Sequence, residues 1–342
     1  MVVENPDKKT NNNCLSLIRL IAALQVILGH LLIHFQLPAN VYLNKAIYFF
    51  RGVPIFFVIS GYLIWFSVIR SKNYSQYIKK RLLRIYPELW VAVIIEIVVL
   101  MVLYNGWKLK DIILFAIGQG TIFQFWTPDS LRGYGVGTPN GALWTIGVMI
   151  QFYIVAWIFF KLLRKRKTVT WIIGFAVSFV ISLLGDYLFI NVIKNELLAK
   201  LYDQTFIKYL WLFYIGMFFA NFNDLVLPIL KKFWYLFLLA AVFFFISGWD
   251  LFSGYYLFWS LFLVAGLIGF AYRFPKFNIK YDISYGLFLY HMTVVNVFVS
   301  FSLTGKWLYI IPVILISAVL ALLSTITIGK ISSKLKFKVV ND

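Results

Sequence analysis

Ionisable side chains interrupt the first long apolar segment of the sequence, LSLIRLIAALQVILGHLLIHF. Arg19 and His30 stand eleven residues apart, about 1,100° of helical rotation and about 16 Å of rise, so both point from nearly the same helix face. His34 follows one turn later on that face. Ionisable groups are costly inside a membrane span and are functional hypotheses there. A neutral histidine at this depth could act as a base or a nucleophile, or simply pack.

Two arginines lie three residues apart in the segment YIKKRLLRIYPELW. Arg81 and Arg84 therefore share one helical face, just before Pro87. A guanidinium group offers a planar fork of donors that suits phosphate oxygens, so the pair could bind a phosphorylated ligand. The alternative is that both arginines only anchor the helix at the cytoplasmic surface, as Lys79 and Lys80 would.

Two further titratable residues stand within apolar surroundings. Glu96 lies between Ile95 and Ile97, where an unpaired carboxylate would be expensive, so it is either neutral or faces a partner. His291 lies several turns into the segment ISYGLFLYHMTVV. No group of residues has metal-ligand spacing, and neither a Walker loop nor a dinucleotide glycine pattern is present, so energy coupling by a nucleotide-binding fold is not supported.

Small residues and a proline mark the second apolar segment, RGVPIFFVISGYLI. Gly52, Pro54, Ser60 and Gly61 could break or thin a helix and let backbone or a substrate approach closely. The alternative is ordinary close packing of two helices through small residues.

The composition defines the environment of these groups. Of the 342 residues, 62% are hydrophobic and 13% are charged, against about 45–50% and about 25% in a soluble domain. One cysteine, Cys14, excludes an internal disulfide and a cysteine-based metal site. The sequence therefore predicts an all-α, polytopic integral membrane protein and excludes a soluble or disordered chain.

We expect about ten transmembrane helices in a single domain over residues 1–342, because a span needs about 20 mostly apolar residues. A polar tail, 1–13, precedes them, and a short basic tail, 330–342, follows. The apolar stretch 112–126 is short and precedes a polar loop, so it is expected to be re-entrant or interfacial. The expected spans are 15–35, 46–69, 85–104, 143–163, 169–190, 206–222, 233–249, 253–271, 283–303 and 308–329.

The basic residues orient these spans. With ten spans, 23 of the 32 lysines and arginines fall on the side that holds both termini, which predicts that both termini are cytoplasmic. The formal charge of +19 is then mainly a topology signal, and no nucleic-acid partner is needed to explain it.

Taken together, these segments resemble the acyltransferase-3 family of bacterial membrane O-acyltransferases over nearly the whole chain. Arg19 followed by ten residues and His30 is similar to the family's first-span signature, and GVPIFFVISGYLI and RLLRIYP resemble its second and third motifs. The stretch LRGYGVGTPNGALWTIGVMIQFY resembles the fourth, and ISYGLFLYH the late motif that ends in His291.

The resemblance implies transfer of an acetyl group from cytoplasmic acetyl-CoA to a sugar hydroxyl of a surface polysaccharide such as O-antigen. It further implies a multi-pass protein of the bacterial inner membrane, with a surface-glycan or lipid-linked sugar acceptor and no metal; a homo-oligomer is compatible with the sequence. The residues that it suggests for catalysis are His30, His291 and Glu96, those for CoA phosphates are Arg19, Arg81 and Arg84, and those for the acceptor are Ser60, Asn140, Trp144, Gln151 and Tyr153.

The chain departs from the family pattern at one position. The usual glutamate two residues before the fourth-motif glutamine is Met149 here, and Glu96 is the only mid-span carboxylate that we expect could replace it. Some relatives carry an esterase-like domain after the spans, whereas this sequence ends at Asp342, so we expect acceptor delivery to rely on the membrane part or a separate protein. Three alternatives stay open: a transporter or flippase of a lipid-linked glycan, an acyltransferase using another donor such as succinyl-CoA, and a non-catalytic family member.

Overall fold

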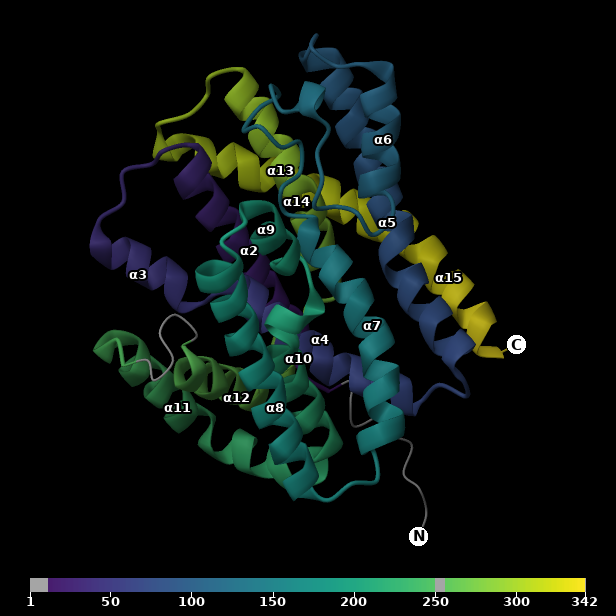
Figure 1. Cartoon of the computed structure of the whole chain (residues 1–342), viewed down its shortest axis with the longest axis vertical. Coiled ribbons are helices and arrows are strands. Elements are labelled where there is room, and N and C mark those ends of the chain that lie inside the picture. Colours follow the sequence, from purple (N-terminus) through teal and green to yellow (C-terminus); the bar gives the residue numbers. More distant parts are fainter. Residues whose placement is uncertain (1–11, 250–255, 342) are drawn as a thin grey trace.

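The computed structural model of the chain describes residues 12–249 and 256–341, and every regular element in these ranges is a helix. Figure 1 shows them as one bundle. The expected tail 1–13 and the start of the expected span 253–271 lie largely outside the described residues. The helices are α2 Leu15–His34, α3 Val41–Phe49, α4 Gly52–Ile69, α5 Tyr74–Leu103, α6 Leu109–Gln119, α7 Trp144–Leu163, α8 Thr168–Tyr187, α9 Glu196–Tyr202, α10 Phe206–Asn221, α11 Asn223–Ser247, α12 Leu257–Arg273, α13 Ser284–Ser300, α14 Ile310–Ile326 and α15 Ile328–Asn341.

Within the described residues, seven helical segments are long and apolar enough to cross a membrane. Helices suit this solvent because all their backbone polar groups are paired within the segment. Large apolar side chains such as Trp90, Ile94 and Val98 lie exposed on the outer face of α5, where lipid would contact them. The protein is therefore an all-α, polytopic membrane protein, as the composition predicted, and the count of ten spans and the side of the termini stay predictions.

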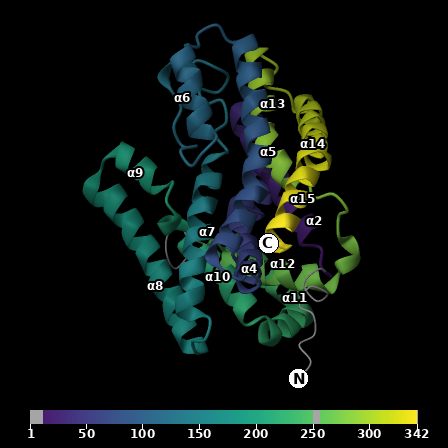
Figure 2. The ribbon, with the colours of Figure 1, turned by 90° about the vertical axis from the view of Figure 1, so that its right-hand side faces the viewer.

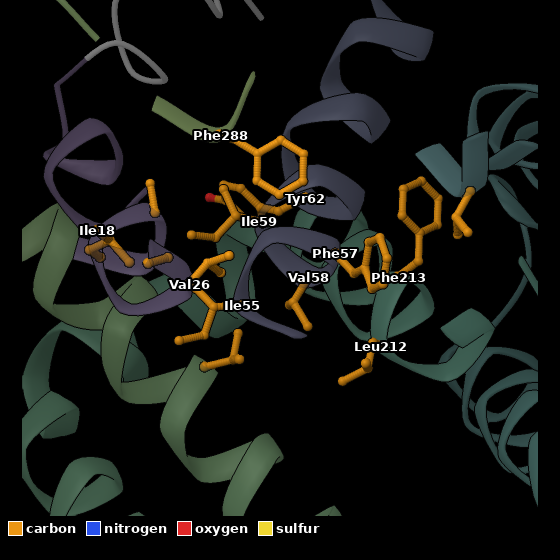
Figure 3. Close-up of a cluster of buried hydrophobic side chains, with 14 of the residues drawn as sticks. Ile18, Val26, Ile55, Phe57, Val58, Ile59, Tyr62, Leu212, Phe213 and Phe288 are labelled. Carbon is orange, nitrogen blue, oxygen red and sulfur yellow. The ribbon is translucent and has the colours of Figure 1, made fainter. Parts of the chain in front are cut away.

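The centre of the bundle is formed by α2, α4, α10 and α13. Figure 3 shows side chains of three of these helices in one cluster, with Val26 from α2, Val58 from α4 and Phe213 from α10. Gly61 of α4 lies against the backbone of Phe213, and Gly216 of α10 lies against the backbone of α4. A side chain at either glycine would collide with the opposite helix, so α4 and α10 pack through small residues.

Helix α4 runs unbroken from Gly52 to Ile69, so the small residues of the second motif do not interrupt it. Pro54 lies in the first turn, where a missing backbone N–H leaves no helical hydrogen bond unmade. The backbone N–H of Gly52 donates a hydrogen bond to Gln25 Oε1 of α2, 2.7 Å away. Close helix packing, rather than a broken helix, is what this motif produces.

Helix α5 begins earlier than the expected span. It starts at Tyr74, where Asn73 caps it, and continues through Pro87 to Leu103. Arg81 and Arg84 therefore stand inside a continuous helix. The expected C-terminal tail is also helical: residues 328–341 form α15, which lies along α5 in both views (Figures 1 and 2).

The expected re-entrant stretch contains α6, whose 11 residues span about 16 Å and are too short to cross a bilayer. An irregular segment, 120–143, follows and carries buried side chains, among them Tyr134 and Asn140. The Asn140 side-chain amide donates to the carbonyl of Leu289 in α13, 2.9 Å away. This hydrogen bond ties the irregular segment to α13.

Candidate active site

One cavity of about 170 Å³ brings together all three arginines that the sequence singled out. Arg19 comes from α2, and Arg81 and Arg84 come from successive turns of α5. Ser60 of α4 and Tyr153 of α7 also line this cavity. Two of the residues expected to bind the acceptor therefore share the cavity with the arginines expected to bind phosphate. Residues from four helices thus converge although they are far apart in the sequence.

The arginines of this cavity carry more positive charge than nearby carboxylates balance. Arg19 forms an ion pair with Asp282, which precedes α13, and Arg84 Nη1 lies 3.8 Å from Glu88. Arg81 has no carboxylate within 4 Å among the described residues. Among those same residues, Nε of both Arg19 and Arg81 is buried without a hydrogen-bond acceptor. Buried donors of this kind are costly, and an anionic ligand would satisfy them.

The two sequence-predicted histidines meet directly. His30 Nδ1 of α2 lies 2.8 Å from His291 Nε2 of α13, although 261 residues separate them in the chain. His34 lies next to the pair, with its ring centroid 5.8 Å from that of His30. His291 is fully buried.

The hydrogen bonds around His291 assign the tautomers of both rings. His291 Nδ1 lies 2.9 Å from the carbonyl oxygen of Phe288 and 3.1 Å from that of Leu287. A carbonyl can only accept, so Nδ1 carries the proton and Nε2 of the neutral ring is an acceptor. His30 must then donate through Nδ1, which leaves its Nε2 unprotonated. No hydrogen-bond partner of that nitrogen occurs in the described part of the chain.

Phe288 connects the two sites. Its side chain lines the arginine cavity, and its backbone carbonyl accepts from His291 one turn further along α13. A long, narrow ligand whose charged end binds the arginines would therefore extend toward the histidine pair.

Glu96 lies apart from both sites and beside the irregular segment 120–143. Its side chain is 1% exposed and neighbours Tyr134 and Asn140. Within the described residues, both carboxyl oxygens lack a hydrogen-bond partner, and so do Asn140 Oδ1 and the Tyr134 hydroxyl. A buried carboxyl group without a hydrogen-bond partner is costly when it is ionised.

Two expected acceptor residues take structural positions instead. The Gln151 side chain donates to the carbonyl of Gln204 and accepts from the backbone N–H of Phe206, each at 3.0 Å, and so holds the start of α10. Trp144 packs against Tyr209, with ring centroids 5.6 Å apart. Neither residue lines the arginine cavity, whereas Met149, which replaces the usual glutamate of the family, does.

Sequence reasoning missed four polar neighbours of the arginine cavity. Asp282 pairs with Arg19, and Tyr285 places its ring 5.8 Å from the Arg84 guanidinium. Glu88 is 2% exposed and accepts from Ser324 at 3.4 Å. The sequence analysis did not consider Glu88, which α5 buries against α14 because the helix continues through Pro87. The fourth neighbour, Lys336, belongs to α15 and interacts electrostatically with Arg84 and Arg81.

Comparison with known proteins identifies the family of this chain. The acyltransferase-3 family, described as an acyltransferase domain, matches residues 12–328. The chain is a member of this family. It is therefore a membrane O-acyltransferase, and the resemblance seen in the five motifs is confirmed.

Three relatives illustrate the range of the family. Nodulation protein 10 of Rhizobium leguminosarum bv. viciae is 27% identical over 334 residues, covering 89% of this chain and 88% of that protein. An O-acetyl transferase of Shigella phage Sf6 is 30% identical over 51% of this chain and 53% of its own length. Peptidoglycan O-acetyltransferase OatA of Listeria monocytogenes is 30% identical over 31% of this chain and 19% of its own length. No solved structure matches the chain.

Proposed function

We propose that this acyltransferase moves an acetyl group from cytoplasmic acetyl-CoA to a sugar hydroxyl of a surface polysaccharide such as O-antigen, in a bacterial inner membrane. The names of the phage and Listeria relatives support acetyl as the acyl group. The observation that carries the proposal is the arginine cavity, whose lining residue Phe288 also accepts a hydrogen bond from His291 through its backbone carbonyl.

The arginine cavity supports a CoA thioester as the donor. CoA is a polyanion and cannot enter hydrocarbon, so its phosphates need cations at the edge of the membrane. Arg19, Arg81 and Arg84 line one cavity, and within the described residues Nε of Arg19 and Nε of Arg81 lack an acceptor. The neutral pantetheine arm would extend from them past Phe288, which directs the thioester toward His30.

In this proposal His30 Nε2 performs the chemistry, since it is the ring nitrogen with a free lone pair. As a general base it would take the proton of the sugar hydroxyl while the hydroxyl oxygen attacks the thioester carbonyl. The C–S bond then breaks, and the proton passes to the CoA thiolate. As a nucleophile the same nitrogen would attack the thioester carbonyl and expel the CoA thiolate as the C–S bond breaks. The sugar hydroxyl would then attack the acetylated imidazole, which leaves as neutral His30 while the hydroxyl proton passes to the thiolate. The hydrogen bond from His30 Nδ1 to His291 orients the ring in either route.

The acceptor would approach from the opposite end of the bundle, near the segment 120–143. Asn140 ties this segment to Leu289, two residues before His291. An acceptor bound against it would place its hydroxyl close to the histidine pair. A glycan is the acceptor class that fits the Listeria relative, which is named a peptidoglycan O-acetyltransferase.

The decisive experiment is NMR of the surface polysaccharide from strains with the gene, without it, and with a His30→Ala variant. We expect O-acetyl methyl signals only with the intact gene, and normal amounts of the variant protein in membranes. Their position would identify the modified hydroxyl.

Two other outcomes would redirect the proposal. Unchanged polysaccharide in all three strains would exclude O-acetylation of that polymer and call for another acceptor or another acyl-CoA such as succinyl-CoA. A polysaccharide that is missing from the surface without the gene would favour a transporter or flippase of a lipid-linked glycan.

A further inference from the structure

The C-terminal helix α15 is docked onto the amino-terminal half of α5 (Figures 1 and 2). The Ser332 hydroxyl donates to the carbonyl of Leu83, and the Gln76 side chain donates to the carbonyl of Val339 at 3.3 Å. Lys336 stands one turn after Ser332 and therefore on the helix face that meets α5. These contacts place the Lys336 side chain beside the arginines of α5 rather than on the outer face of α15.

Lys336 differs from the other lysines of α15. Lys330, Lys334 and Lys338 are exposed, whereas Lys336 is half-buried and interacts electrostatically with Arg84 and Arg81. Glu88 also interacts with Lys336, but in the described part of the chain no carboxylate lies within 4 Å of its ammonium group. One lysine of the four thus joins a cluster of like charge without a close counter-ion.

Such a cluster is unfavourable in the protein alone. Arg19, Arg81, Arg84 and Lys336 are four cations, and Asp282 and Glu88 are the two carboxylates that interact with them. Like charges at half-buried positions repel, and burial removes part of the water that would screen them. Two uncompensated positive charges are balanced when a polyanion binds, so the arrangement favours a ligand with more than one phosphate group.

The position of Lys336 distinguishes which part of the ligand it meets. The three arginines line the cavity, whereas Lys336 does not and stands outside it, next to Arg84. In a CoA thioester the diphosphate leads to the pantetheine arm, and the 3′-phosphate is on the ribose at the far, nucleotide end. With the thioester directed inward past Phe288, the nucleotide end stays outside the cavity.

We propose that Lys336, together with Arg84, forms the subsite for the ribose 3′-phosphate of the acyl-CoA donor. This assignment rests on the proposed function, and it makes α15 a wall of the donor site. It also makes the enzyme selective for CoA over 3′-dephospho-CoA.

The test is direct binding of CoA and of 3′-dephospho-CoA to the purified full-length protein by isothermal titration calorimetry. We expect the intact protein to bind CoA more tightly than 3′-dephospho-CoA. Lys336→Ala should weaken CoA binding about tenfold and leave 3′-dephospho-CoA binding unchanged, since only one charged hydrogen bond is lost. Lys336→Arg should keep the preference for CoA.

Lys334→Ala and Lys338→Ala are matched controls, because each removes one exposed lysine of the same helix and should leave both affinities unchanged. The assignment is overturned if Lys336→Ala weakens both ligands equally, if it weakens neither, or if the intact protein binds the two ligands equally. In these three cases CoA still binds and the proposed donor stands. If the intact protein binds neither ligand, the proposed function itself is lost.

Discussion

Helices α2 and α13 contribute to both the arginine cavity and the histidine pair, and α4, α5 and α7 complete the cavity. The two sites nevertheless differ in how their polar groups are satisfied. Around the arginines, buried guanidinium nitrogens lack acceptors and positive charge exceeds negative charge. Around the histidines, three ring nitrogens are hydrogen-bonded and one lone pair is left. The arginine donors need an anion to satisfy them. The histidine pair is already hydrogen-bonded within the protein, and it leaves the lone pair of His30 Nε2 free to react.

This contrast separates binding from chemistry along one axis of the molecule. Interactions that hold the donor equally in its ground and transition states lower KM, whereas groups that act only during bond formation raise kcat. Changes at the two sites should therefore be distinguishable by comparing CoA binding with acyl transfer.

The largest effect is expected from His30→Ala. Because the variant lacks the free Nε2, acyl transfer should fall by about 10²–10⁴-fold. CoA binding should stay close to that of the intact protein, since the arginine cavity is untouched. Transfer of radiolabelled acetyl groups in membranes and CoA binding to the purified variant measure the two quantities. Equal losses of both would contradict the division between the sites.

Arg81→Ala should give the converse result. Removing a charged donor that has no carboxylate partner nearby should weaken CoA binding by about 10–100-fold. The loss should shrink at high salt, which screens charge interactions at this half-buried site. Arg132→Ala is the control, because Arg132 is exposed and pairs with Asp129 outside the cavity. Similar CoA affinities of the two variants would show that Arg81 does not bind the donor.

His291→Ala should have an intermediate effect on transfer. His30 would keep its free nitrogen but lose the acceptor of its Nδ1–H, which we expect to slow transfer about tenfold. His291→Gln offers a side-chain oxygen as a replacement acceptor and should recover part of that rate. Steady-state transfer at saturating acetyl-CoA compares them. A His291→Gln variant as slow as His291→Ala would argue against an orienting hydrogen bond.

Glu96 should affect stability more than chemistry. Glu96→Ala leaves a void at a buried position, so the free energy of unfolding should drop by about 2–3 kcal/mol. Glu96→Gln keeps the shape and a donor and should cost less than about 1 kcal/mol. Thermal unfolding in detergent compares them, with acyl transfer measured in parallel. If Glu96→Gln is stable but inactive, an ionised carboxylate takes part in catalysis.

The smallest effect is expected from Met149→Leu. Met149 supplies an apolar wall of the arginine cavity, and a volume-conserving exchange should cost less than about 1.5 kcal/mol of stability. CoA binding and acyl transfer should both stay near the level of the intact protein. A large loss of transfer would mean that this position, where the family motif is expected to have a glutamate, has a specific part in the reaction.

Much of the site could be predicted before the structure. Arg19 and His30 were identified from their helical spacing and their cost in a membrane, and Arg81 and Arg84 from the donors that they offer a phosphate. These arguments use only local geometry and the chemistry of each residue type. They succeed because a helix face is determined within a few turns.

Other contacts could not be predicted from the sequence because they depend on which helices meet. Gln151 stands in a family motif, yet both ends of its side chain hold the backbone at Gln204 and Phe206. Glu88 follows Pro87 and was not recognised as a buried group. In the sequence, Lys336 was only one of many basic residues that orient the spans, and its proximity to the arginines follows from the packing of α15 on α5.

The sequence by itself determined the environment, the helical class and the family, since hydrophobicity, spacing and motif order are properties of the chain alone. Only the tertiary structure decided that His30 pairs with His291 across 261 residues and that Arg19 pairs with Asp282 across 263. The reason is physical: periodicity states which face of a helix is polar, but not which other helix that face contacts. The tautomer that frees His30 Nε2 follows from such a contact and from nothing local.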